Sequence, residues 1–107
     1  MYIQTERVIF RKEKNPYAKD TPYYLAVFPD DKAIPGRLVC VPLYFNSNGD
    51  AIFEPCCEID KAYYYSTHLV HRFDPEAPKL LKAITDYYSN EVPAKFRIIQ
   101  KLPRWNI

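Results

Sequence analysis

The sequence predicts a single α+β domain, residues 1–107, in which a mostly antiparallel sheet of four or five strands packs on one long helix. Short apolar runs punctuated by single prolines indicate strands, and an Asn-Gly pair indicates a hairpin between two of them. One further segment has the spacing of an amphipathic helix. A chain of 107 residues with 48% hydrophobic and 26% charged residues has the size and composition of one globular domain.

Five runs have the composition of strands, because they are rich in β-branched, aromatic and other apolar residues. The run YYLAVF is apolar throughout and ends at Pro29, so we expect it to be a buried strand. In chain order, the predicted strands are residues 5–12, 23–28, 37–45, 51–57 and 94–102.

The Asn48-Gly49 pair is the strongest local signal in the chain. Asn-Gly favours the positive φ angles of a type I′ turn, so we expect a hairpin with a two-residue loop. That register places Pro42 opposite Pro55 at a non-hydrogen-bonded pair, where neither strand needs the N–H that proline lacks. The prolines therefore favour this register over one shifted by a residue.

The same register places Cys40 opposite Cys57, while Cys56 points to the other face. The facing Cα atoms should lie about 4.5 Å apart, a spacing that a disulfide allows. However, an odd number of cysteines does not form a secreted disulfide framework, and cytosolic thiols are kept reduced. We therefore expect packed free thiols in a soluble, cytoplasmic protein.

The clearest helix is predicted at about residues 76–89. Pro75 suits the start of a helix, whereas Pro78 requires the helix to begin late or with a loose turn. Residues 60–70 fit either a second short helix or a strand, and the helix is preferred because three consecutive tyrosines need not all be buried. The face of the longer helix consists of Ala77, Leu80, Leu81, Ile84 and Tyr88.

Charge is segregated along the chain. Residues 1–19 carry five basic and two acidic side chains, and residues 92–107 carry four basic and no acidic ones. Residues 20–91 carry six basic and eleven acidic side chains, so the middle of the chain is acidic. No run approaches the roughly 20 apolar residues that span a bilayer, so we expect no membrane partner.

No motif of a catalytic or cofactor site is present. Two glycines cannot build a phosphate-binding loop, and the nucleophile elbow and paired-histidine protease motifs are absent. We therefore expect no enzyme activity and no cofactor. Cys56, Cys57, His68 and His71 are candidate zinc ligands, but their spacing fits no C-x₂-C pattern, so we expect no metal either.

Ten tyrosines exceed what one small core can hold. Tyrosine is enriched at the hot spots of protein interfaces, and segregated charge can steer a partner. The sequence therefore predicts a small non-enzymatic binding or regulatory protein that docks on another protein through a tyrosine-rich surface. The predicted interface residues are Tyr63, Tyr64, Tyr65 and Tyr87.

An alternative hypothesis is a module that binds single-stranded nucleic acid. Arg7 and Arg11 share one face of the first predicted strand, and Arg97 and Lys101 share one face of the last. If those strands pair, four cations line one surface beside tyrosines that could stack on bases. The pI of 8.4 is low for a dedicated nucleic-acid binder, so protein docking ranks first. Metal binding or an unrecognised enzyme activity ranks third.

Overall fold

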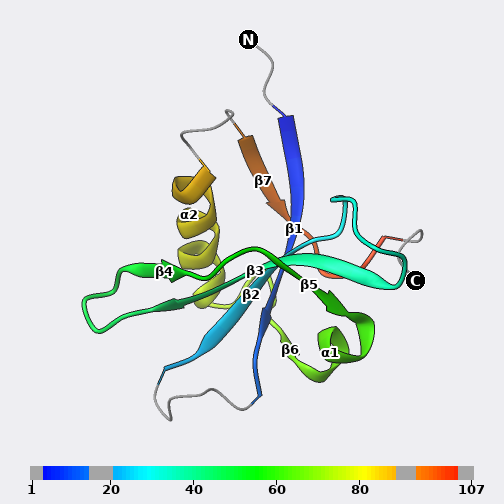
Figure 1. Cartoon of the computed structure of the whole chain (residues 1–107). Helices are drawn as coiled ribbons and strands as arrows, with labels where there is room; N and C mark the ends of the chain where they lie inside the picture. The colour runs from blue at the N-terminus through cyan, green and yellow to red at the C-terminus, as the bar shows by residue number, and fades with distance from the viewer. Residues whose placement is uncertain (1–3, 15–20, 89–93, 104–107) are drawn as a thin grey trace.

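The computed structural model describes residues 4–14, 21–88 and 94–103. Figure 1 shows their strands as a curled sheet, with helix α2 on one side and helix α1 near the opposite end. The elements in chain order are β1 (Gln4–Lys12), β2 (Tyr23–Phe28), β3 (Arg37–Phe45), β4 (Ala51–Phe53), β5 (Cys57–Asp60), α1 (Lys61–Ser66), β6 (His68–Leu69), α2 (Glu76–Tyr88) and β7 (Ala94–Ile98).

These elements make one compact α+β domain with a mixed sheet. The strand order is β4-β3-β2-β1-β6, with β5 beside β3 and β7 beside β1. Within the described ranges, five strand pairings are antiparallel and the β1–β7 pairing is parallel. The described sheet therefore has seven strands rather than the four or five that we predicted. One predicted strand is divided between β4 and β5, and the short β6 adds another.

The turn between β3 and β4 has three residues rather than the two that Asn-Gly predicts. The Asn46 N–H donates to the Asp50 carbonyl oxygen at 2.9 Å, and the Gly49 N–H donates to the Asn46 carbonyl oxygen at 2.9 Å. The Asn46 Oδ1 atom also accepts from the N–H groups of Asn48 and Asp50 at 3.0 and 2.9 Å. Gly49 has a φ of 82°, a conformation in which glycine has no Cβ penalty. A three-residue loop with a left-handed glycine thus replaces the predicted type I′ turn.

The longer loop shifts the hairpin register by one residue. Pro42 lies opposite Glu54 rather than Pro55, and the Pro42 carbonyl oxygen accepts the Glu54 N–H at 2.9 Å. The predicted pairing of Cys40 with Cys57 is nevertheless present, because the segment between β4 and β5 absorbs one extra residue. The prediction of one continuous strand at 51–57 is therefore wrong.

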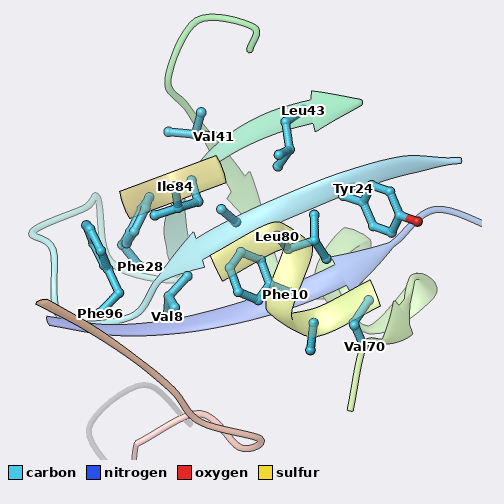
Figure 2. Close-up of a cluster of buried hydrophobic side chains, with 12 residues drawn as sticks. Val8, Phe10, Tyr24, Phe28, Val41, Leu43, Val70, Leu80, Ile84 and Phe96 are labelled. Carbon is cyan, nitrogen blue, oxygen red and sulfur yellow. The ribbon is translucent and has the colours of Figure 1, made fainter. Parts of the chain in front are cut away.

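Helix α2 covers one face of the sheet, as its apolar spacing predicts. Leu80 and Ile84 lie fully buried among side chains of β1, β2 and β3, an arrangement visible in Figure 2. Pro78 is the third residue of α2, so the N–H that it lacks has no intrahelical partner to lose. The helix has 13 residues and is not the long helix that we expected, and the predicted end at residue 89 lies outside the described ranges.

The opposite face of the sheet is covered by α1 and by the chain after β7. Tyr64 of α1 and Leu102 pack there against residues of β1, β2 and β3. The Asp60 carboxylate caps α1 by accepting the Tyr63 N–H at 2.7 Å. The short helix predicted within 60–70 is therefore present but ends at Ser66, because His68 and Leu69 pair with β1 as strand β6. In the described residues, no helix is long and apolar enough to cross a membrane.

Candidate functional site

The three consecutive tyrosines of α1 have different environments. Tyr64 is only 2% exposed, whereas Tyr63 and Tyr65 are 40% and 61% exposed. Successive residues of a helix point in directions about 100° apart, so a Tyr64 that faces the sheet leaves its neighbours on the two flanks. The prediction of Tyr64 as an interface residue is therefore wrong, while Tyr63 and Tyr65 lie at the surface.

Helix α1 is fixed to the sheet by a buried arginine. The Arg11 guanidinium lies 4.4 Å from the centre of the Tyr64 ring, a cation–π distance. Its Nε donates to the Thr67 Oγ1 atom at 2.9 Å, and its Nη2 donates to the Thr67 carbonyl oxygen at 2.6 Å. Arg11 is only 8% exposed, so it cannot belong to a phosphate-binding surface as the nucleic-acid hypothesis requires.

A cleft of about 330 Å³ lies beside Tyr63, between α1, β5 and the start of β2. A neighbouring hollow of about 240 Å³ shares Glu13 and Tyr63 with this cleft. Tyr63 therefore forms a wall common to both. The lining residues of the larger cleft are Glu13, Tyr23, Leu25, Pro42, Glu54, Cys57, Ile59 and Tyr63.

Two carboxylates make this cleft acidic. The pKa of Glu13 is raised above its ordinary value, first by burial and then by the negative charge of Glu54. Within the described ranges, neither side chain makes a hydrogen bond or an ion pair with the protein. A positive group that entered the cleft would therefore meet two carboxylates that no described residue pairs.

We predict that Glu54→Gln lowers the pKa of Glu13. The substitution removes the repulsion between the two carboxylates but leaves the burial that is the larger cause, so the pKa should fall only part of the way to its ordinary value. Carboxyl-carbon NMR titration measures this directly. Glu58→Gln is the matched control, and an equal shift in that variant would contradict the coupling of Glu13 to Glu54.

Tyr87 does not share this surface. It belongs to α2, which covers the other face of the sheet, and its ring stacks on Phe53 at a centroid distance of 4.1 Å. Tyr87 is 48% exposed, so it is accessible there. The four predicted tyrosines therefore do not form one surface. Tyr64 is buried, Tyr63 and Tyr65 are exposed on two sides of α1, and Tyr87 lies on the other face of the sheet.

The basic residues of the first and last strands come together only in part. Arg7 faces Arg97 in the parallel β1–β7 pairing. The Arg7 guanidinium binds Asp30 through two hydrogen bonds of 2.9 and 2.5 Å, which lower the pKa of that carboxyl together with the charge of Arg97. Lys101 is exposed beyond the end of β7. Because Arg11 is buried toward the other end of β1, the predicted surface of four basic side chains does not form.

The four candidate zinc ligands do not lie together in one site of the described structure. Cys57 begins β5 and Cys56 precedes it, whereas His68 lies on β6 and His71 stacks on Phe73 at 5.7 Å. In the part of the chain that the structure describes, no three histidine, cysteine or acidic side chains are arranged to hold a metal ion.

Sequence reasoning missed Glu13 and Tyr23 as site residues. Glu13 follows β1 in a segment with no motif, and it reaches the cleft because its N–H donates to the Tyr23 carbonyl oxygen at 2.9 Å. The sequence offered one signal, because strands that follow each other in the chain often pair as neighbours. The structure has this antiparallel pairing of β1 with β2, which places the end of β1 beside the start of β2.

Comparison with known proteins assigns no family to this chain. It matches no protein-family model, and neither the curated proteins nor the solved structures give a match. A functional inference therefore starts from the exposed tyrosines of α1 and the acidic cleft beside them.

Proposed function

We propose that this is a small non-enzymatic binding or regulatory protein that docks on another protein through the α1 surface. We define the α1 surface as Tyr63, Tyr65 and the cleft that Glu13 and Glu54 line. The observation that carries the proposal is the position of Tyr63, which is 40% exposed and also forms a wall of the acidic cleft. Accessible tyrosine beside a pocket is typical of interface hot spots.

The chemistry of the cleft favours a basic side chain of the partner. Glu13 and Glu54 supply negative charge that no residue of the described ranges pairs, and the rings of Tyr23 and Tyr63 supply aromatic faces. An arginine guanidinium uses both, because it forms bidentate hydrogen bonds with carboxylates and stacks on aromatic rings. We therefore propose a partner that inserts an arginine, or less favourably a lysine, beside Tyr63.

Helix α1 is anchored to the sheet before a partner arrives. The buried Tyr64 and the hydrogen bonds from Arg11 to Thr67 attach the helix to the sheet, and Asp60 caps its first turn. A side chain on a fixed element loses less conformational freedom on binding, so more of its contact energy contributes to affinity. These anchoring contacts favour docking at α1 over docking at a loop.

The proposal places the protein in the cytoplasm. The structure pairs Cys40 with Cys57 as free thiols whose sulfur atoms lie 3.6 Å apart, and Cys56 is also free. Thiols at this spacing persist unoxidised in a reducing compartment.

Single-stranded nucleic acid is the alternative partner that an experiment must separate from a protein. Without Arg11, the hypothesis retains Arg7, Arg97 and Lys101, and Arg7 already binds Asp30. Three phosphate contacts to a single strand predict a log–log salt slope of about −2. A tyrosine-centred protein interface should depend on salt much less.

We expect Tyr63→Ala to weaken binding of a protein partner by roughly 30-fold or more, the effect of losing a hot spot of about 2 kcal/mol. The partner is captured from native lysate with and without nuclease, and its affinity for the variants is then measured by calorimetry. Tyr87→Ala is the matched control and should change the affinity less than about twofold, because Tyr87 belongs to α2 on the other face of the sheet and stacks on Phe53. Capture that nuclease abolishes, or that Arg97→Ala with Lys101→Ala abolishes while Tyr63→Ala does not, contradicts the proposal.

A further inference from the structure

Two cysteines face each other across the β3–β5 pairing. Cys40 lies in the middle of β3 and is fully buried, and Cys57 begins β5 and is exposed. Their Sγ atoms lie 3.6 Å apart, so the two thiols are in contact. The strand register holds both residues at directly opposed positions, which a disulfide can bridge without rearrangement of the sheet.

We propose that Cys57 and Cys40 form a thiol–disulfide exchange site, at which a low-molecular-weight disulfide such as oxidised glutathione converts the pair into a cross-strand disulfide. Cys57 is the entry thiol because it is exposed and lines the cleft beside Tyr63. Cys40 is the resolving thiol because it is buried and contacts the Cys57 sulfur. The inference does not depend on the docking proposal, since it concerns only the two thiols.

The exchange takes place in two balanced steps. Cys57 first ionises and gives its proton to solvent, and the thiolate then attacks one sulfur of oxidised glutathione. This attack forms a mixed disulfide on Cys57 and releases one glutathione thiolate, which takes up a proton from solvent. The Cys40 sulfur then attacks the Cys57 sulfur and displaces the second glutathione, which takes the Cys40 proton. Two protein thiols are oxidised and one glutathione disulfide is reduced to two thiols.

The environment of each sulfur supports this order of events. Burial, followed by the hydrogen bond to Cys57, raises the pKa of Cys40, so its thiolate is scarce and a direct first attack by Cys40 is slow. After the mixed disulfide forms, contact between the sulfurs compensates for the low thiolate fraction, because the second step is intramolecular. The exposed position of Cys57 and the buried position of Cys40 therefore match the entry and resolving roles.

Cys56 is exposed as well but is placed differently. It precedes β5 and lies outside the Cys40–Cys57 pairing, and its pKa is raised first by the partial burial of its sulfur and then by Cys57 and nearby carboxylates. A raised pKa lowers its thiolate fraction at neutral pH. Cys56 therefore serves as the internal control for the exchange site.

The experiment incubates the reduced, purified full chain with oxidised glutathione at neutral pH. We expect the number of titratable thiols in denaturant to fall from the three of the sequence to one. The intact mass should fall by the mass of two hydrogen atoms, and non-reducing peptide mapping should link Cys40 to Cys57. Dithiothreitol should reverse all three changes.

Three variants assign the roles. Cys56→Ser should still form the disulfide, and Cys40→Ser should stop at a stable glutathione adduct on Cys57. Cys57→Ser should leave Cys40 unmodified. Because Cys40 is buried, its substitution can destabilise the fold. The peptide map of the wild-type protein and the variants Cys56→Ser and Cys57→Ser therefore suffice to decide. A disulfide between Cys56 and Cys57, a dimer linked through Cys56, or a wild-type protein that stays glutathionylated without closing the Cys40–Cys57 bond overturns the proposal.

Discussion

Replacing Tyr64 with alanine is expected to lower the free energy of unfolding by about 3–5 kcal/mol, the range for truncating a large buried aromatic side chain. Tyr64 is among the largest fully buried side chains in the described ranges, and it packs with Ile9, Val27 and Leu38 beneath α1. Its loss leaves a cavity at the sheet and removes the ring that lies beside the Arg11 guanidinium. Urea denaturation followed by circular dichroism gives the loss as a reduced midpoint.

Tyr65→Ala is the matched control for this substitution. Tyr65 is the next residue of the same helix but is 61% exposed, so its removal should cost less than about 1 kcal/mol. Similar losses for the two variants would contradict the orientation of α1 and, with it, the α1 surface.

Arg11→Met is expected to lower the free energy of unfolding by about 1.5–3 kcal/mol, because it removes charge-assisted hydrogen bonds and leaves the buried Thr67 carbonyl oxygen without this donor. Methionine keeps most of the packing volume, so the loss reports the hydrogen bonds rather than a cavity. The pKa of Tyr64 provides a second readout. Burial raises it and Arg11 opposes that rise, so the pKa should increase further in the variant, as ultraviolet titration can measure.

Arg7→Met is the control for Arg11→Met, because both residues lie on the same face of β1. The Arg7–Asp30 ion pair is partly exposed, with side-chain exposures of 26% and 37%. Exposed pairs of this kind contribute at most about 1 kcal/mol. An Arg7→Met variant less stable than Arg11→Met would contradict the assignment of Arg11 as the anchor of α1.

Strands that are apolar runs between clear breakers are predictable from the sequence. Residues 23–28 and 37–45 form the strands β2 and β3, as predicted. Both runs are mostly apolar, Pro29 marks the end of the first and Gly36 marks the start of the second. The break at residues 54–56 is not predictable in the same way. The break follows from the three-residue loop between β3 and β4, which the Asn46 side chain stabilises through two hydrogen bonds. The Asn-Gly pair alone favours a two-residue loop.

The candidate site was predictable only where it is local in sequence. Tyr63 and Tyr65 stand out in a run of tyrosines, but burial of the residue between them depends on how α1 lies on the sheet. The acidic side of the cleft joins Glu13 to Glu54, two residues far apart in the chain that strand pairing brings together. Tertiary proximity of this kind has no local sequence signal.

An NMR titration with a blocked tetra-arginine peptide tests the α1 surface most directly. The account predicts saturable amide shifts that centre on Glu13, Glu54 and Tyr63, much weaker shifts with a blocked tetraglutamate peptide, and loss of the arginine response in Tyr63→Ala with Glu54→Gln. Arginine shifts that are absent from the cleft, or that glutamate reproduces there, would contradict the central claim that the α1 surface binds a basic side chain.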